Sequence, residues 1–190
     1  VFPRIPLTSI KSFDSDGTAT LSAIIRGIEW AVNNSIRIIN MSYGIDDHQP
    51  VLHEAIKAAA RQNVLMIAAS GNEGTAYVTY PARYPEVIAV GSTNRNNQVS
   101  SFSQYGNSLD IVAPGEEILS TWINRSYRTI SGTSMACAHV TGAASLVLAA
   151  KPKASAAEIK DLLLTSTERL SASYLKQGNG LISVSAIIEK

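Results

Sequence analysis

Residues 131–136 place a serine where nucleophilic chemistry could begin. Their sequence, Ser-Gly-Thr-Ser-Met-Ala, has a glycine turn that delivers Ser134 to the start of an apolar stretch. A helix N-terminus offers unpaired backbone N–H groups and a partial positive charge, which favour an anion developing beside the serine. The alternative interpretation is that Thr133 or Ser134 only caps the helix, because both residue types are preferred there.

Asn72 is the second residue whose type suits this chemistry. It lies between glycines in the sequence Ser-Gly-Asn-Glu-Gly, at residues 70–74. Acyl transfer builds negative charge on the carbonyl oxygen of the cleaved bond, and a neutral side-chain amide can donate to that oxygen without titrating. Asparagine is also common in turns, where it tolerates left-handed backbone geometry, so a purely structural role is the alternative.

The elements that must position these residues alternate between helix and strand. Helical spacing of apolar residues predicts helices over residues 21–33 and from Leu52 to Ala59. Short apolar runs predict strands at 36–41, 64–69 and 87–90, and residues 5–13 contain a further strand-like run. Strands this continuously apolar must be covered on both faces, so the predicted fold class is α/β, a parallel sheet flanked by helices in three layers.

The pattern changes beyond residue 110. Residues 117–123 and 127–131 are rich in β-forming residues and predict a hairpin. Residues 135–150 predict a long helix rich in small side chains, and Ser155 with Glu158 has the spacing of a capping box for another helix. The segment 180–190 is too short to classify. No repeat or linker divides the chain.

Several short segments, taken in order, resemble those of the subtilisin-like serine proteases, closely those of bacteria, over nearly the whole chain. They are Gly-Ile-Glu-Trp-Ala at 27–31, Ile-Asn-Met-Ser-Tyr-Gly at 39–44, Ala-Ala-Ser-Gly-Asn-Glu-Gly at 68–74, Tyr-Pro-Ala-Arg-Tyr-Pro at 80–85, Ser-Phe-Ser at 101–103, Ala-Pro-Gly at 113–115 and Gly-Thr-Ser-Met-Ala at 132–136. The resemblance implies a serine endopeptidase in which Ser134 is the nucleophile, forming an acyl-enzyme, and Asn72 is the oxyanion donor.

The same resemblance implies a substrate cleft. Its residues would be Ser42, Tyr43, Gly44, Ala69, Ser70, Gly71 and Thr79. Residues 42–44 would pair with an extended substrate backbone, and residues 69–71 would form the opposite wall of the pocket before the cleaved bond. Thr79, near the base, stands where many relatives have glycine, so we expect a shallower pocket. Glu73 would lie at the rim, where it either favours a basic substrate residue or is only solvated.

The helix that follows Ser134 departs from the usual pattern of these proteases. Cys137 is expected to be a buried packing residue, and Ala138 stands where the family usually has proline. His139 belongs to the family's helix motif, and the resemblance gives it no proton-transfer role. His48 and His53 lie outside the matched motifs and are expected to be exposed.

The acid and the base of the expected mechanism are missing from the matched segments. Subtilisins carry the triad in the order Asp, His, Ser, and both earlier motifs are expected upstream of Val1. Residues 1–190 are therefore predicted to be the C-terminal part of a single catalytic domain, with an incomplete sheet and almost no activity alone. The competing interpretation is a catalytically inactive peptide-binding or scaffold module on the same half-fold.

Expectations about partners follow from that interpretation. Residues 5–10 would become an exposed sheet edge that binds the N-terminal catalytic segment or a second copy of the chain. The chemistry requires no cofactor, but calcium could bind as a structural ion at backbone carbonyls near Ala82 and Tyr84. The resemblance implies a secreted or cell-surface protein.

Composition excludes several other classes of protein. The 190 residues carry a net charge of +1, so nothing indicates nucleic acid as a partner. The longest apolar stretches, 64–69 and 146–150, fall short of the roughly 18 residues that a membrane span needs. A single cysteine, Cys137, excludes an internal disulfide.

Overall fold

A six-stranded sheet forms the centre of the computed structural model, which describes residues 5–189. In spatial order its strands are β1 (Ile38–Met41), β2 (Leu65–Ala69), β3 (Val87–Thr93), β4 (Ile111–Pro114), β8 (Leu181–Ile182) and β7 (Thr167–Glu168). The first five of these run parallel, and only β7 pairs antiparallel. The carboxyl ends of β1 to β4 therefore share one edge, where ligands bind in open sheets of this kind.

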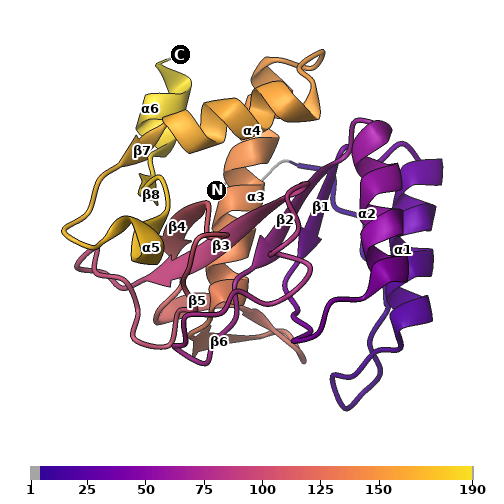
Figure 1. Ribbon diagram of the computed structural model, residues 1–190, viewed down its shortest axis with the longest axis horizontal. Helices are drawn as coiled ribbons and strands as arrows, with labels where there is room; N and C mark the ends of the chain where they lie inside the picture. Colours follow the sequence, from indigo (N-terminus) through magenta and orange to yellow (C-terminus); the bar gives the residue numbers. More distant parts are fainter. Residues whose placement is uncertain (1–4, 190) are drawn as a thin grey trace.

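Helices cover both faces of the sheet (Figure 1). Helices α1 (Leu21–Asn33) and α2 (Pro50–Arg61) lie side by side on one face, while α3 (Thr133–Ala150) and α4 (Ala156–Thr165) cover the other. Two short helices, α5 (Tyr174–Gln177) and α6 (Val184–Ile188), complete the C-terminal region. The strands β5 (Ile118–Trp122) and β6 (Ser126–Ile130) form a separate antiparallel hairpin before α3.

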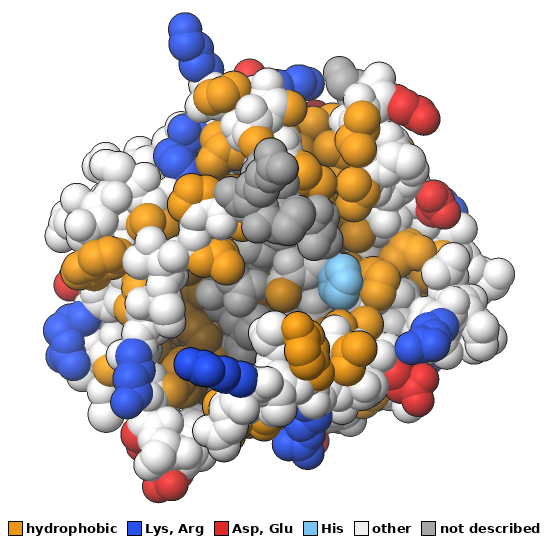
Figure 2. Space-filling model, turned by 180° about the vertical axis from the view of Figure 1, so that it is seen from behind, with side chains coloured by type: hydrophobic (Ala, Val, Ile, Leu, Met, Phe, Trp, Pro, Cys, Tyr) orange, Lys and Arg blue, Asp and Glu red, His pale blue; other side chains and the backbone are white. Residues whose placement is uncertain are grey.

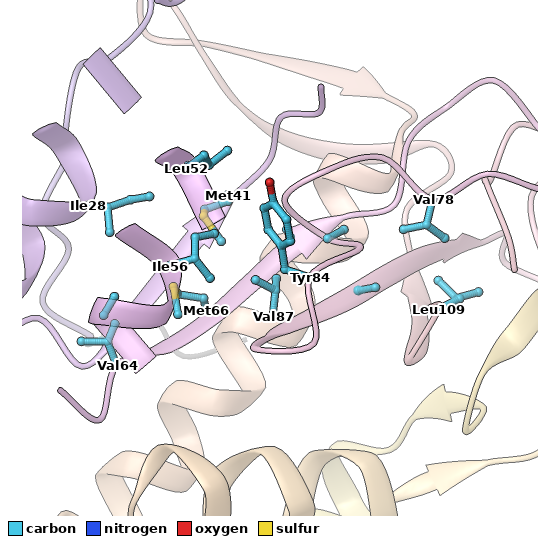
Figure 3. Close-up of a cluster of buried hydrophobic side chains, with 14 of the residues drawn as sticks. Ile28, Met41, Leu52, Ile56, Val64, Met66, Val78, Tyr84, Val87 and Leu109 are labelled. Atoms are coloured by element: carbon cyan, nitrogen blue, oxygen red, sulfur yellow. The ribbon is translucent and has the colours of Figure 1, made fainter. Parts of the chain in front are cut away.

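Successive residues of the central strands point to opposite faces of the sheet. They belong in turn to two hydrophobic clusters, one on each face. Met66 on β2 packs with Leu52 and Ile56 of α2 (Figure 3), whereas Ile67 faces Val140 of α3. All five are fully or almost fully buried. This two-sided burial explains the continuously apolar strands and confirms the three-layer α/β/α prediction.

The helices and the hairpin that the sequence predicts are present. Helix α1 begins after Thr20, whose side chain accepts a hydrogen bond from the Ala23 N–H, and α4 begins with the predicted capping box of Ser155 and Glu158. Each hydroxyl or carboxylate occupies a backbone N–H that the helix cannot satisfy itself. The C-terminal β8 and α6 were not predicted, because elements of two and five residues are too short to show a periodic spacing of apolar residues.

The strand expected within residues 5–13 is wrong. Residues 5–13 form no strand, and on this side of the sheet the edge strand is β1 rather than residues 5–10. Pro6 lacks a backbone donor, and an apolar run becomes a strand only where a neighbour offers a ladder. The segment instead lines a cavity of about 450 Å³ beside β1, together with α1 and the Thr141 and Ser145 flank of α3.

The surface carries charged side chains of both signs, as the near-neutral composition predicts. On the face in Figure 2, Lys and Arg side chains lie scattered among Asp and Glu, while hydrophobic side chains gather toward the middle. Among the described helices, α3 alone is long and apolar enough to suit a membrane span, with a mean hydropathy of 1.4. Its burial against β1, β2, β3 and β4 is that of the core helix of a layered fold.

Asp110, just before β4, should make stability depend on pH. Its Oδ2 accepts a hydrogen bond from the Ala89 N–H at 2.9 Å, but burial outweighs that bond and raises the pKa of the carboxyl. A folded-state pKa above the unfolded value means that the contribution to stability is present below the unfolded pKa and is lost as pH rises through the folded pKa. Asp110→Asn keeps an acceptor without a charge, so we expect a higher free energy of unfolding at pH 7.

Urea unfolding at two pH values checks this prediction. The stabilisation should fade as pH falls through the raised folded-state pKa and be lost below about pH 3.9, the ordinary carboxyl pKa, because the wild-type side chain is then neutral in both states. Asp161→Asn, on the exposed surface of α4, is the matched control. It should not show a gain in the free energy of unfolding that is present at pH 7 and lost at acidic pH. A variant less stable than wild type at pH 7 would contradict the prediction.

Candidate active site

Ser134 occupies the first turn of α3, close to the end of β1. Its Oγ donates to the Ser42 carbonyl oxygen at 3.3 Å, and the Ser42 Oγ donates to the Ser134 carbonyl oxygen at 3.1 Å. The helix N-cap is Gly132, which has no side chain to accept a helix N–H, so the interpretation of Thr133 or Ser134 as the cap is wrong. Gly132 is held by its N–H, which donates to the Gly115 carbonyl oxygen at 2.8 Å.

Thr133 fixes the orientation of the Asn72 amide. The Thr133 N–H donates to Asn72 Oδ1 at 2.8 Å, and the Thr133 Oγ1 donates to the same oxygen at 2.9 Å. A backbone N–H can only donate, so it selects the amide oxygen and leaves Nδ2 as the outward donor. Within residues 5–189 no hydrogen bond occupies Nδ2. The sequence contains Thr133 inside a recognised motif, but the contact across 61 positions could not be read from it.

Two donors therefore lie at the turn that leads into Ser134. Asn72 is exposed and offers Nδ2, and the Ser134 N–H belongs to the first turn of α3, where the helix provides no acceptor. The positive end of the helix dipole adds to both. This arrangement suits the stabilisation of an oxyanion formed at a carbon attacked by Ser134 Oγ.

The predicted pocket walls lie at the carboxyl ends of neighbouring strands. Residues 42–44 follow β1, and residues 69–71 close β2. Thr79 is buried between them: its Oγ1 donates to the Ser70 carbonyl oxygen at 3.3 Å, and a Cβ on Gly44 would meet that Oγ1 at 2.5 Å. The Tyr43 ring packs against Phe13, and its burial raises the pKa of the phenol.

The other candidate groups are not poised for proton transfer to Ser134. His139 Nδ1 lies 3.0 Å from the Met135 carbonyl oxygen, and no described imidazole hydrogen-bonds to Ser134. The Cys137 Sγ is fully buried and donates to the Asn40 Oδ1 at 3.2 Å. Burial raises the pKa of this thiol to about 12, so it is a packing residue rather than a nucleophile.

The expectation that both other histidines are exposed is wrong for one of them. His48 is exposed, but His53 is half-buried, with its ring stacked on Tyr84 at 4.1 Å between centroids. Its Nε2 lies 3.1 Å from Glu86 Oε2. The partner lies 33 positions away, so the position of His53 on its helix gave no sign of it.

Calcium binding stays a prediction. The Tyr84 carbonyl oxygen already accepts a hydrogen bond from the Val87 N–H, whereas Ca²⁺ takes six to eight oxygen ligands. Among the described residues, no group of three or more His, Cys, Asp or Glu side chains could hold a metal ion.

Hydrolases that work through acyl transfer use a nucleophilic serine beside hydrogen-bond donors for the oxyanion. This α/β fold presents such a pair, a serine in the first turn of a helix and an oriented side-chain amide. Comparison with known proteins then gives the family. Residues 1–180 match the sequence profile of the subtilase family, peptidase S8. The chain belongs to this family of serine proteases.

Individual relatives agree with the family assignment. The chain is 41% identical over 186 residues to Subtilisin BL of Lederbergia lenta, which covers 98% of the chain and 69% of that protein. It is equally identical to an alkaline protease of Alkalihalobacillus alcalophilus, of which it covers 49%. The solved prenylagaramide maturation protease PagA superposes with a TM-score of 0.86 at 31% identity, covering 93% of this chain and 69% of that one. The chain thus spans about half to about two thirds of the length of these relatives.

Proposed function

We propose that this chain is the C-terminal part of a single serine endopeptidase domain and supplies its nucleophile and oxyanion donor. The observation that carries the proposal is the pair of hydrogen bonds from Thr133 to Asn72 Oδ1, which leaves Nδ2 without a hydrogen-bond partner among residues 5–189, at the turn that leads into Ser134. An asparagine that only tolerated the backbone geometry of the turn would not require its side-chain amide to be held in one orientation. Family membership supports peptide bonds as the substrate and a secreted or cell-surface location.

The reaction proceeds in two acyl transfers. Ser134 Oγ attacks the peptide carbonyl carbon and gives its proton to a histidine, while the carbonyl oxygen becomes an oxyanion held by Asn72 Nδ2 and the Ser134 N–H. The C–N bond then breaks, and the amine leaves with the proton. Water attacks the resulting ester by the same steps in reverse order, releasing the acid and restoring the Ser134 hydroxyl.

The histidine and the aspartate that orients it come from polypeptide outside residues 1–190. This part of the proposal rests on two features of the described residues: no imidazole hydrogen-bonds to Ser134, and β1 is an edge strand that pairs only with β2. The cavity beside β1 is lined by Ile38, Ile39 and the polar flank of α3, so it offers both a strand ladder and apolar surface. We call this chain together with that segment the complemented protease.

A serine-directed fluorophosphonate probe tests the proposal. Ser134 should be labelled in the complemented protease, not in the chain alone, because a serine without its base is a weak nucleophile. Ser134→Ala should remove the label. Absence of labelling in both forms would overturn the proposal and favour the inactive peptide-binding or scaffold module.

Thr79 should restrict the substrate residue before the cleaved bond to small side chains. Its Oγ1 and Cβ occupy the space facing Gly44, between the two pocket walls. Thr79→Gly should therefore raise kcat/KM for a phenylalanine substrate relative to an alanine substrate by about tenfold or more, a typical effect of freeing a few atoms in a pocket.

Thr79→Ser separates volume from hydrogen bonding. It keeps the hydroxyl that donates to Ser70 and removes only a methyl group, so its preference should lie between the wild type and Thr79→Gly. Peptide libraries varied at this one position measure the ratio. An unchanged phenylalanine-to-alanine ratio in Thr79→Gly would place the pocket elsewhere.

A further inference from the structure

Gln104 contacts the loop that carries Asn72 through both its backbone and its side chain. It is buried, with 2% of its surface exposed, and has no role in the proposed chemistry. Its N–H donates to the Gly71 carbonyl oxygen at 3.1 Å, and its carbonyl oxygen accepts from Ser70 Oγ at 3.1 Å. Its Nε2 donates to Thr75 Oγ1 at 3.2 Å. These bonds hold the loop on both sides of Asn72.

The Gln104 amide also fills the space beside Gly71. Gly71 has a φ of +111°, and a Cβ built there would lie 1.3 Å from Gln104 Oε1. That oxygen is buried and has no hydrogen-bond partner within residues 5–189. A buried acceptor without a hydrogen-bond partner lowers the stability of the fold. We therefore look for a role of the Gln104 side chain other than stabilising the fold.

The surrounding segment completes the attachment. The Gly74 N–H donates to the Phe102 carbonyl oxygen at 2.8 Å, and the Tyr105 N–H donates to the Thr75 carbonyl oxygen at 3.1 Å. Loop 70–75 is thus fastened to residues 102–105 at both ends, while Asn72 itself is exposed and, among residues 5–189, its side chain hydrogen-bonds only to Thr133. Movement of the loop would change the direction of Nδ2 before it broke any element of the core.

We propose that Gln104 is a positioning residue for the oxyanion donor. It fixes loop 70–75 so that Asn72 Oδ1 stays on Thr133 and Nδ2 points at the carbonyl oxygen of the cleaved bond. The catalytic consequence rests on the proposed function, whereas the positioning of the loop does not. The two can therefore be tested separately.

Amide hydrogen exchange in the chain alone tests the positioning. In Gln104→Met, exchange of the Gly71, Gly74 and Thr133 N–H groups should accelerate at least tenfold relative to core amides of β3. Gln177→Met is the matched control, because Gln177 is equally buried and its side chain bonds backbone groups of Leu170 and Ala172, which are not part of loop 70–75. Equal acceleration in both variants, or none in Gln104→Met, overturns the proposal.

Thr75→Val removes the hydroxyl that accepts from Gln104 Nε2. Because Thr75 is exposed, this variant should fold even if Gln104→Met does not, so the test remains decisive. It should accelerate the same three amides, and an unchanged pattern counts against the proposal.

Kinetics of the complemented protease test the consequence. Gln104→Met should lower kcat at least tenfold with KM changed less than twofold, and combined with Asn72→Ala it should cost nothing further, because both act through one donor. Fully additive losses overturn the inference. A wild-type complemented protease without Ser134 labelling would instead overturn the proposed function, and the exchange result would still decide the role of Gln104.

Discussion

Replacing Ser134 by alanine should lower kcat of the complemented protease by about 10⁶, the scale already known for the nucleophile of subtilisin, a member of the same family. The Ser134 Oγ forms the acyl bond, whereas the neighbouring Ser42 and Thr133 hydroxyls donate to the Ser134 carbonyl oxygen and to Asn72 Oδ1. The fold should survive, because alanine keeps the Cβ and is favourable within a helix. Active-site titration and kcat, measured with a peptide substrate, give the result.

Ser145→Ala is the matched control for this prediction. Ser145 lies in the same helix and donates to the Thr141 carbonyl oxygen at 2.8 Å, so its replacement also removes one hydroxyl hydrogen bond from α3. Turnover should remain within a few-fold of wild type. Residual activity of Ser134→Ala near the wild-type level would identify another nucleophile and remove the basis of the proposed mechanism.

Regular features of the fold were predictable because they are local. The apolar spacing of α2 and the capping box at Ser155 depend on residues within a few positions of one another. The apolar run at residues 5–13 was misread as a strand for the opposite reason. Whether an extended segment forms a ladder depends on a neighbouring strand, and composition does not encode the neighbour.

The site shows the same division between local and distant contacts. Motifs place Ser134 and Asn72 in the sequence, because each motif is a short turn whose residue types suit one chemistry. The contacts that orient them join positions far apart: Thr133 reaches back to Asn72, and Gln104 reaches back to Thr75. Neither residue type signals such a role alone, so a positioning residue becomes visible only in three dimensions.

Asn72→Ala should lower kcat by about 10²–10³, the known cost of losing this type of donor in subtilisin, which sets the scale here. KM should change little, because Nδ2 donates to charge that develops only as the carbonyl is attacked. Steady-state kinetics of the complemented protease measure both constants. A raised KM with unchanged kcat would assign Asn72 to ground-state binding instead.

Asn72→Asp separates the donor from the structural support. Alanine removes Nδ2 and also strips the Thr133 N–H of its acceptor, which at a buried residue costs about 1–3 kcal/mol. Aspartate keeps an oxygen for Thr133 but presents a second oxygen, carrying negative charge, where the oxyanion forms. Asn72→Asp should therefore retain more of the free energy of unfolding than Asn72→Ala and yet lose at least as much kcat. Because a purely supporting asparagine would give the reverse ranking in kcat, the pair of variants distinguishes a donor to the transition state from a residue that only holds the turn.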